Sequence, residues 1–478
     1  MLKRLLFVLI TSCTLVVKAQ TVVSDTFITM FNTGNRVAVI DYLENNMSEE
    51  RVERYGIDAH VGVFLNSQST YGKLTLIERL PNNENNQQTV VVSENNGQTY
   101  LLTINLTETL PQKINYFSLQ DPDNNENSSP QITLSELKQQ LFKFIKKLND
   151  KDAFSGSILV ANGKDVLLKT SVGLANREWK QKNQVDTRFS IGSMNKMFTA
   201  ISALQLIEKG ELNFDDKLVQ FVDKSWLPEG EVELITVRQL LTHTSGLGNF
   251  FNSDFNASNK EVYRDLDAYK PLVSGTPLLF TPGTRNRYSN SGMLMLGLIV
   301  EKVSGLSYYD YIQQNIYDQA GMSKSGSFEL DSVTPNLAIG YLKRSHSEGW
   351  VNSTYTRAVK GSPAGGGFST VSDLHKFALA LTNYQLLGKT LTEQAYSAKT
   401  QYNSAFWYGY GFSVSGTLDD RVVGHGGAYL GVDARLDIHL DSGFIVVILA
   451  NQSDVVAPVR REINQLLTKM KTKNISKD

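Results

Sequence analysis

Two strand-like hairpins that stand far apart in the sequence constrain the fold more than any other feature of the chain. The first, GSILVANGKDVLLKTSVG, has two apolar runs around Asn162–Gly163, a dipeptide typical of two-residue hairpin turns. The second, YLGVDARLDIHLDSGFIVVILAN, turns at residues 441–443. The pattern between them is mostly helical. We therefore predict an α/β (α+β) domain with one antiparallel sheet built from both ends, and with the helices of residues 190–400 packed on it.

A smaller domain precedes this one. Residues 20–122 begin with a helical part and continue with alternating segments such as KLTLIERL and TYLLTINL, separated by the Asn-rich turns PNNENNQQ and ENNGQ. This pattern predicts a small α+β accessory domain with an antiparallel meander. The polar stretch DPDNNENSSP then marks a linker at residues 123–131, so that the larger domain covers 132–470 and leaves a frayed tail at 471–478.

The amino-terminal segment MLKRLLFVLITSCTLVVKAQ has a basic start, an apolar stretch and a small-residue end. Residues 1–19 are therefore predicted to be a secretory signal that is cut before Gln20. The only cysteine, Cys13, lies inside it, so the mature chain would hold neither a disulfide nor a thiolate catalyst. A lipoprotein signal, with Cys13 lipidated, is the alternative. Since no later run is apolar enough to span a bilayer, we expect an exported protein, periplasmic or secreted.

Composition excludes several classes of function. The chain has 478 residues, of which 41% are hydrophobic, and its 47 basic and 48 acidic residues give a formal charge of -1. No global attraction to nucleic acid or to an anionic membrane follows, so binding must come from a local site. No metal-ligand spacing links His60, His346, His375 and His439 with one another or with acidic residues, and we expect neither a metal nor a cofactor.

Ser-x-x-Lys, the spacing of a nucleophile and its base, occurs twice, which is what chance would give in a chain this long. The copy at Ser135 and Lys138 lies in an amphipathic helix that starts at the capping box of Thr133 and Glu136. Its serine faces solvent, and we interpret this copy as structural. The apolar face of that helix is predicted to contain Leu134, Leu137, Leu141, Phe142, Ile145 and Leu148.

The other copy, Ser193 and Lys196, opens a segment whose spacing predicts a buried helix. Residues three apart are neighbours on a helix, so Lys196 would lie beside Ser193. The positive end of the helix dipole and burial both disfavour a charged lysine, and a neutral Lys196 can take the serine proton. The pattern alone also fits a polar helix start. The predicted buried face contains Met197, Ile201, Leu204 and Ile207.

Tyr288-Ser289-Asn290 is the only Tyr-x-Asn in the chain, and it lies between a Pro-Gly turn and an apolar helix. Tyrosine can shuttle a proton when nearby cations lower its pKa, and asparagine can hold a substrate amide. A loop tyrosine followed by a helix N-cap asparagine is the alternative interpretation.

His425-Gly426-Gly427 opens a terminal strand. Because glycines let another backbone approach closely, a substrate can pair along this strand, with His425 as a donor or a cation. A structural histidine is the alternative. The residues 324–326, Lys-Ser-Gly, are a lysine-based version of this pattern, but they lead into no long strand and we interpret them as a turn.

Three further features are given no catalytic role. His243 in LLTHTSGL is expected to be a buried, hydrogen-bonded loop residue. PAGGGFS (363–369) lacks the Gly-Lys-Ser end of a phosphate-binding loop. We expect it to let the chain pass close to the site and to cap the next helix from Ser369 or Ser372. No Gly-x-Ser-x-Gly occurs, which argues against an α/β-hydrolase.

The order Ser-x-x-Lys, Tyr-x-Asn, His-x-Gly resembles the serine β-lactamase and penicillin-binding protein superfamily, specifically its class C β-lactamase-like and DD-peptidase-like branch. The resemblance spans about 132–470 and includes LLTHTSGL, TPGTRNRYSNSG and SPAGGGFSTVSDLHKFALAL. It implies a β-lactamase/transpeptidase-like fold and catalysis through an acyl-enzyme without metal or cofactor.

The same resemblance implies a role for each matching residue. Ser193 would be the acylated nucleophile and Lys196 its proton partner. Tyr288 would exchange protons with the serine and the leaving group, and Asn290 would orient the substrate. The backbone N–H groups of Ser193 and Ala428 would form the oxyanion hole.

His425 takes a place that is lysine in true class C β-lactamases, and Gly426 and Gly427 would bind substrate along the strand. A charged lysine suits the carboxylate of a β-lactam, whereas a histidine can be neutral at pH 7. We therefore expect a serine hydrolase acting on a peptide or amide of D-amino acid or D-Ala-D-Ala type, or on an ester, with small-molecule or peptide substrates that include peptidoglycan fragments. A class C-like β-lactamase and a non-catalytic penicillin or peptidoglycan sensor are the alternatives.

Overall fold

The computed structural model describes residues 23–81, 85–120, 131–345, 349–403, 406–417 and 420–470. The predicted leader with Cys13, the predicted tail and all of the predicted linker except Gln131 lie outside these ranges, as does His346. Within the described ranges, no helix is both long enough and apolar enough to cross a membrane.

The chain divides into two compact units. The first consists of Met1–Gln131, Phe142–Ala153 and Leu342–Val351, and the second of Ile132–Leu141, Phe154–Tyr341 and Asn352–Asp478. The smaller unit thus takes in two short segments from the later part of the chain. The domain boundaries at 20–122 and 132–470 stay a prediction.

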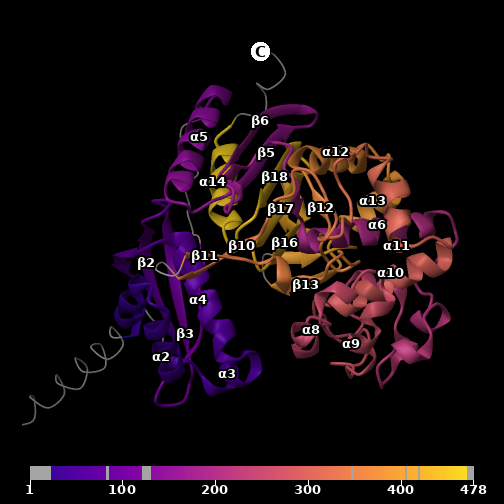
Figure 1. Ribbon diagram of the computed structural model, residues 1–478, viewed down its shortest axis with the longest axis horizontal. Helices are drawn as coiled ribbons and strands as arrows, with labels where there is room; N and C mark the ends of the chain where they lie inside the picture. The colour runs from indigo at the N-terminus through magenta and orange to yellow at the C-terminus, as the bar shows by residue number, and fades with distance from the viewer. Residues whose placement is uncertain are drawn as a thin grey trace, which may run out of the picture. The chain divides into compact units, whose positions relative to one another are not determined.

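The first unit contains helices followed by a four-stranded antiparallel meander in the order β1-β2-β3-β4 (Figure 1). Buried and less buried residues alternate along β2 and β3, as a strand with one covered face requires. Phe27 and Phe64 from the helices meet with ring centroids 5.2 Å apart and cover that face together with Phe31. Residues 23–33 are helical, and the named elements are α2 (Arg36–Asn46), α3 (Glu49–Tyr55), α4 (Ile57–Tyr71), β1 (Leu74–Arg79), β2 (Asn86–Ser93), β3 (Thr99–Leu106) and β4 (Ile114–Gln120).

The second unit is built on an eight-stranded antiparallel sheet in the order β13-β14-β15-β16-β17-β18-β5-β6 (Figure 1). β5, from the start of the domain, pairs with β18, from its end, with Leu159 opposite Val447. This confirms the predicted sheet built from both ends. The predicted hairpin also forms, but Asn162 is still in the strand and pairs with Asp165, so that the two-residue turn is 163–164 and not the dipeptide Asn162–Gly163. The strands are β5 (Gly156–Asn162), β6 (Asp165–Val172), β13 (Thr400–Asn403), β14 (Phe406–Tyr408), β15 (Ser413–Gly416), β16 (Arg421–Tyr429), β17 (Val432–His439) and β18 (Phe444–Ala450).

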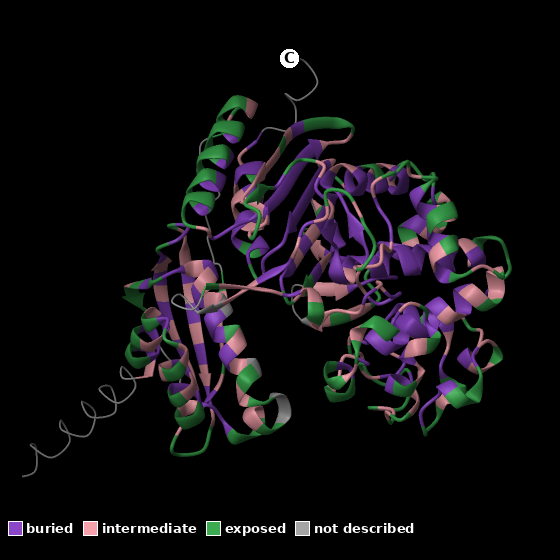
Figure 2. Ribbon diagram, in the orientation of Figure 1, coloured by how far each residue is buried: buried purple, intermediate pink, exposed green. Residues whose placement is uncertain are grey.

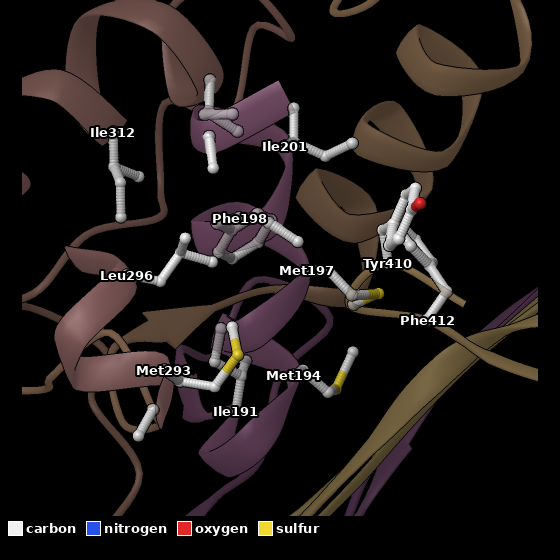
Figure 3. Packing of buried hydrophobic residues seen from close by; sticks show 14 of the residues in the cluster. Ile191, Met194, Met197, Phe198, Ile201, Met293, Leu296, Ile312, Tyr410 and Phe412 are labelled. Atoms are coloured by element: carbon white, nitrogen blue, oxygen red, sulfur yellow. The ribbon is translucent and has the colours of Figure 1, made fainter. Parts of the chain in front are cut away.

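The helical middle of the chain packs on this sheet, and the central strands are buried (Figure 2). α6 (Asn195–Glu208) is apolar on nearly all sides and therefore lies in the core. Its Met197 and Phe198 pack between Leu296 of α10 on one side and Tyr410 on the other (Figure 3). The other helices of this unit are α7 (Val237–Leu241), α8 (Ser253–Ala257), α9 (Lys270–Ser274), α10 (Asn290–Ser304), α11 (Tyr308–Ile312), α12 (Val371–Thr382), α13 (Lys389–Ala395) and α14 (Val456–Thr468). The helix α5 (Leu134–Asp150) is divided between the units, since Phe142 and the residues after it are assigned to the first.

Short strands complete the structure: β7 (Leu174–Asn176) pairs with β8 (Gln181–Lys182), β9 (Phe189–Ser190) with β12 (Phe368–Ser369), and β10 (Tyr341–Ser345) with β11 (Gly349–Asn352). The β9–β12 pair matters for the site, because it fixes the glycine-rich segment before Phe368 against the chain that leads to Ser193.

Local details both confirm and correct the expectations. The capping box forms, with Glu136 N donating to Thr133 Oγ1 at 3.2 Å and Thr133 N to Glu136 Oε2 at 2.8 Å. Phe142 of α5, predicted to be on the apolar face, is 58% exposed, and Phe144 is buried instead. The cap of α12 is Thr370, whose hydroxyl accepts from Asp373 N at 3.1 Å, and not Ser369 or Ser372. Adjacent Ser and Thr have the same capping chemistry, so only the backbone path decides.

Candidate active site

Ser193 lies in a single 3-10 turn, Gly192–Met194, directly before α6. Gly192 has φ 51°, and a Cβ there would lie 3.1 Å from the carbonyl carbon of Gly427 on β16. A glycine is needed here both for the left-handed backbone and for the close approach. The turn therefore presents Ser193 directly against the strand that carries the His-Gly-Gly pattern.

Lys196 is wholly buried on the first turn of α6. Its Nζ donates to Ser193 Oγ at 3.1 Å, to Asn290 Oδ1 at 2.7 Å and to the carbonyl oxygen of Ala364. Among the described residues it forms no ion pair, and burial lowers its pKa well below the usual value for lysine. Because all three partners are neutral, nothing in the contacts holds the lysine in its charged form.

Tyr288 and Lys196 are also neighbours, with the lysine Nζ 4.7 Å from the centroid of the tyrosine ring. Burial raises the pKa of Tyr288, and a hydrogen bond with Ser193 opposes this only in part. The expectation that nearby cations lower the pKa of this tyrosine is therefore wrong, because desolvation is the larger effect. Tyr288 stays a neutral phenol that can donate a proton.

Asn290 is the first residue of α10, and the cap of that helix is Ser289, whose Oγ accepts from Gly292 N at 2.8 Å. The alternative of an N-cap asparagine is thereby excluded. The Asn290 amide instead bridges the site, since its Oδ1 accepts from Lys196 and its Nδ2 donates to Asn249 Oδ1 at 2.9 Å. Asn249 thus fixes which end of the amide faces the lysine.

His425 is buried on β16. Its Nδ1 lies 2.5 Å from the carbonyl oxygen of Gly426, and its Nε2 lies 3.1 Å from the hydroxyl of Tyr408. A carbonyl only accepts, so Nδ1 carries the proton and Nε2 accepts from Tyr408. Burial, and next the positive charge of Lys196, lower the pKa of His425 to about 3. The ring is therefore neutral at pH 7, and not a cation.

The backbone of β16 passes the serine turn at van der Waals distance. A Cβ on Gly427 would lie 1.9 Å from the carbonyl oxygen of Ile191 and 3.1 Å from Ser193 N, and a Cβ on Gly192 would lie 3.2 Å from Ala428 N. The amides of Ser193 and Ala428 thus belong to two segments in direct contact, as a two-donor oxyanion hole requires.

A cavity opens beside these two residues. One wall is the loop that leads from Arg357 through the glycine-rich segment to Phe368, and the rest comes from apolar and aromatic side chains of other elements. These are Phe251, Tyr269, Leu330 and Tyr429. A mostly apolar cavity thus reaches Ser193.

His243 has the role that the sequence predicts, a buried loop residue, and it also borders the site. Its Nδ1 accepts from Ser289 N at 3.2 Å, and its ring lies 4.6 Å from the rings of both Tyr288 and Tyr408. Burial and the charge of Lys196 lower its pKa. Burial therefore favours the neutral form of His243, whose ring packs against that of Tyr288.

Neither of the two patterns interpreted as structural, at Ser135 and at Lys324, shares the chemistry of this cluster. Ser135 and Lys138 are exposed on α5. Lys324 lies in a turn and pairs with Asp186 at 3.0 Å. Among the described residues, no three His, Cys, Asp or Glu side chains are grouped so that they could hold a metal ion.

Sequence reasoning did not find three residues of the cluster: Tyr408, Asn249 and Ala364. Tyr408 bonds His425, Asn249 bonds Asn290, and the Ala364 carbonyl accepts from Lys196. None of them belongs to a pattern with fixed spacing. For Ala364, the glycine-rich stretch around it was the available signal, since such a stretch indicates close backbone approach.

A serine turn before a buried helix, a lysine without a carboxylate partner among the described residues, and a glycine strand at the edge of the serine turn are the features of the β-lactamase and penicillin-binding protein type of site. Residues 141–468 match the sequence profile of the family described as Beta-lactamase, and the chain belongs to this family. It is therefore a member of the β-lactamase-like serine hydrolase and penicillin-binding protein superfamily, as the resemblance predicted.

Individual relatives agree with this. Penicillin-binding protein 4* of Bacillus subtilis (strain 168) is 30% identical over 332 residues, which are 66% of this chain and 72% of the relative. The crystal structure of a penicillin binding protein from Bacillus halodurans, 32% identical, superposes with a TM-score of 0.62 over 70% of this chain and 99% of the other. D-amino acid amidase from Ochrobactrum anthropi SV3 shares the fold, with a TM-score of 0.59 and 20% identity over 70% of this chain and 98% of its own.

Proposed function

We propose that the protein is an exported serine hydrolase that forms an acyl-enzyme on Ser193 and cleaves a peptide or amide bond of D-amino acid or D-Ala-D-Ala type, or an ester. The observation that carries this proposal is Lys196, which is buried, has no carboxylate partner in the described part of the chain and lies with its Nζ 3.1 Å from Ser193 Oγ. Burial favours the neutral form of such a lysine, and a neutral amine can take the proton of a serine nucleophile.

In the acylation step, Ser193 Oγ attacks the carbonyl carbon of the substrate while Lys196 takes the serine proton. Negative charge then moves to the carbonyl oxygen, and the N–H groups of Ser193 and Ala428 stabilise it. Loss of one such donor typically costs about 100- to 1000-fold in kcat. Gly426 and Gly427 would hold the substrate backbone along β16.

The leaving group needs a proton, and we assign its delivery to Tyr288, which is neutral and close to both Ser193 and Lys196. Lys196 would then restore the tyrosine proton, so that the serine proton ends on the amine or alcohol that leaves. Asn290 would position the acyl amide. Water attacks the acyl-enzyme next. Lys196 and Tyr288 pass a proton from this water to Ser193 Oγ, which releases the acid.

His425 bears on the choice of substrate. A lysine at this place offers a permanent charge to the carboxylate of a β-lactam, and the neutral His425 does not. We therefore place amide or ester hydrolysis ahead of β-lactamase activity. The presence of nucleophile, base and proton donor in one cluster places an enzyme ahead of a sensor.

The decisive experiment labels purified protein with a fluorophosphonate and with a fluorescent penicillin. Ser193→Ala should abolish labelling, while Ser135→Ala, which removes the serine of the exposed second Ser-x-x-Lys copy, should leave it intact. Labelling that persists in Ser193→Ala would overturn the proposal. A hydrolysis panel of D-Ala-D-Ala peptides, D-amino acid amides, p-nitrophenyl esters and nitrocefin then assigns the substrate, and a single acylation without turnover would indicate a sensor.

Export rests on the sequence of residues 1–19 alone. Secretion of the full chain from a bacterial host, followed by mass measurement of the mature protein, tests it. We expect Gln20 at the new amino terminus. A lipid-modified Cys13 at the amino terminus would support the lipoprotein alternative, and an uncut chain in the cytoplasm would overturn export.

A further inference from the structure

The cavity beside Ser193 contains a cation that no described residue neutralises. Two basic side chains, Arg357 and Lys360, belong to its lining, and none of the described residues that line it is an Asp or a Glu. The other lining side chains are apolar, aromatic or hydroxyl-bearing. Arg357 is partly buried, so its charge loses part of its hydration, and a ligand of opposite charge can compensate that loss.

The two basic residues differ in their partners. Lys360 Nζ lies 3.2 Å from Glu329 Oε1 and 4.2 Å from the centroid of the Tyr309 ring. The Arg357 side chain has no hydrogen bond or ion pair among the described residues; its Nε is buried without a partner, and its guanidinium carbon lies 6.0 Å from the Phe368 ring. Burial lowers its pKa to about 10, which leaves it charged at pH 7.

A guanidinium matches a carboxylate particularly well, because its planar fork donates two parallel hydrogen bonds. An ammonium group on the ligand would instead be repelled. The aromatic and aliphatic walls around Arg357 favour a ligand that reaches the guanidinium through an apolar stem.

The position of the cavity indicates which half of the substrate enters it. Ser193 and Ala428 line the cavity, whereas Tyr288 and His425 are not among the described residues that line it. In the proposed reaction the leaving group must lie beside the proton donor, Tyr288. The acyl half therefore extends the other way, into the cavity and toward Arg357.

We propose that Arg357 binds a carboxylate on the acyl portion of the substrate, and that the protein prefers acyl groups ending in a carboxylate over neutral acyl groups and over those with a free ammonium. This inference rests on the proposed function, since it takes Ser193 as the acylated residue. It narrows the substrates to acidic acyl compounds, such as peptides whose acyl side carries a free carboxylate.

The test measures how three ligands protect Ser193 of the full chain from a fluorophosphonate. The ligands are N-succinyl-D-alaninamide, N-acetyl-D-alaninamide and D-alaninamide, which present a carboxylate, no charge and an ammonium. We expect the succinyl compound to protect at a concentration about 10- to 100-fold lower than the acetyl compound, as a charge-assisted hydrogen bond gives, and D-alaninamide to be weakest.

Variants assign the preference to the residue. Arg357→Gln should bring the succinyl-to-acetyl ratio close to one, and Arg357→Lys should retain part of it. The matched control is Arg238→Gln, which removes an arginine that also contacts a phenylalanine ring, at 4.8 Å, but lies outside the cavity lining. The control should keep the wild-type ratio.

The possible results separate the two proposals. Equal protection by the succinyl and acetyl compounds in the wild-type protein would overturn the role of Arg357 while labelling of Ser193 still supports the hydrolase. A preference that survives in Arg357→Gln, or that Arg238→Gln also removes, would overturn it as well. Absence of labelling at Ser193 would overturn the hydrolase itself, and this inference with it.

Discussion

Lys196 Nζ lies 3.1 Å from Ser193 Oγ, the lysine is fully buried, and all of its hydrogen-bond acceptors in the described part of the chain are neutral. The pair is therefore a hydroxyl beside an amine that loses its proton easily, and not a serine beside a fixed positive charge. This difference decides what the site can do, since only the neutral amine can act as a base.

Replacement of Lys196 by arginine separates charge from basicity. A guanidinium stays protonated at any accessible pH, so Lys196→Arg keeps a cation but removes the base. We expect kcat/KM to fall by about 100- to 10000-fold, the usual range for a general base. Circular dichroism and the unfolding midpoint control for misfolding, and a folded Lys196→Arg protein that retains wild-type activity would refute the role of Lys196.

The pH dependence of kcat/KM should show a single ascending limb that belongs to Lys196. Burial lowers the pKa of this lysine, and the base form accumulates as the pH rises through that pKa. His425, with its pKa lowered to about 3, stays neutral from pH 5 to pH 9 and adds no inflection near 6.5. The profile of His425→Gln should therefore keep the wild-type shape. Loss of an inflection near 6.5 in this variant would contradict the assignment.

Stability should also depend on His425 in a defined direction. The unfolded histidine takes up a proton below pH 6.5, whereas the folded one resists protonation down to about 3, so the folded state loses stability as the pH falls through this window. At pH 5 the loss from this residue amounts to about 2 kcal/mol relative to neutral pH.

Urea unfolding of wild type and His425→Gln at pH 5 and pH 7.5 measures this. Asp433, whose pKa is raised to about 7, shifts stability in the opposite direction over the same range, and His243 in the same direction as His425. Asp433 and His243 contribute equally in both proteins, so their contributions cancel when the free energies of unfolding of the wild type and the variant are subtracted. The wild type should lose more free energy of unfolding than the variant on acidification, and equal losses would show that His425 is protonated in the folded protein.

The sequence predicted those parts of the molecule that rest on local spacing. The two hairpins predicted the sheet. Two short patterns predicted Ser193, Lys196 and Asn290, and the fold brings both Ser193 and Asn290 into contact with Lys196. Tertiary packing decides the rest. Tyr408 and Arg357 reach the site from segments without any pattern, and α3 and α4 of the first unit were not predicted as separate helices.

Caps show the same limit on a smaller scale. Serine, threonine and asparagine side chains can all cap a helix, so the sequence could not tell Ser289 from Asn290 or Thr370 from Ser369. The choice at α10 has a chemical consequence, because Ser289 caps the helix and leaves the Asn290 amide free to bond Lys196. The raised pKa of Tyr288 could not be predicted from the sequence either, since it depends on how deeply the ring is buried.

The two glycines after His425 should differ sharply when each is replaced by alanine. A Cβ on Gly427 would lie 1.9 Å from the backbone oxygen of Ile191. Because this oxygen belongs to the backbone, no side-chain rotation can remove the clash, and the strand or the serine turn must move. A Cβ on Gly426 would have its nearest neighbour among the described residues at 3.6 Å, which is ordinary van der Waals contact. The neighbouring residue is thus a built-in control for the effect of a methyl group on β16.

We expect Gly427→Ala to lower kcat/KM at least about 100-fold, because a shift of this strand misplaces the Ala428 donor of the oxyanion hole. Gly426→Ala should lower it less than about tenfold. Fluorophosphonate labelling rates report the same contrast without a known substrate, since the phosphonyl oxygen occupies the same hole. Similar rates for both variants would mean that the approach of β16 to the serine turn is not what sets the geometry of the hole, and that the two amides do not act together on the developing charge.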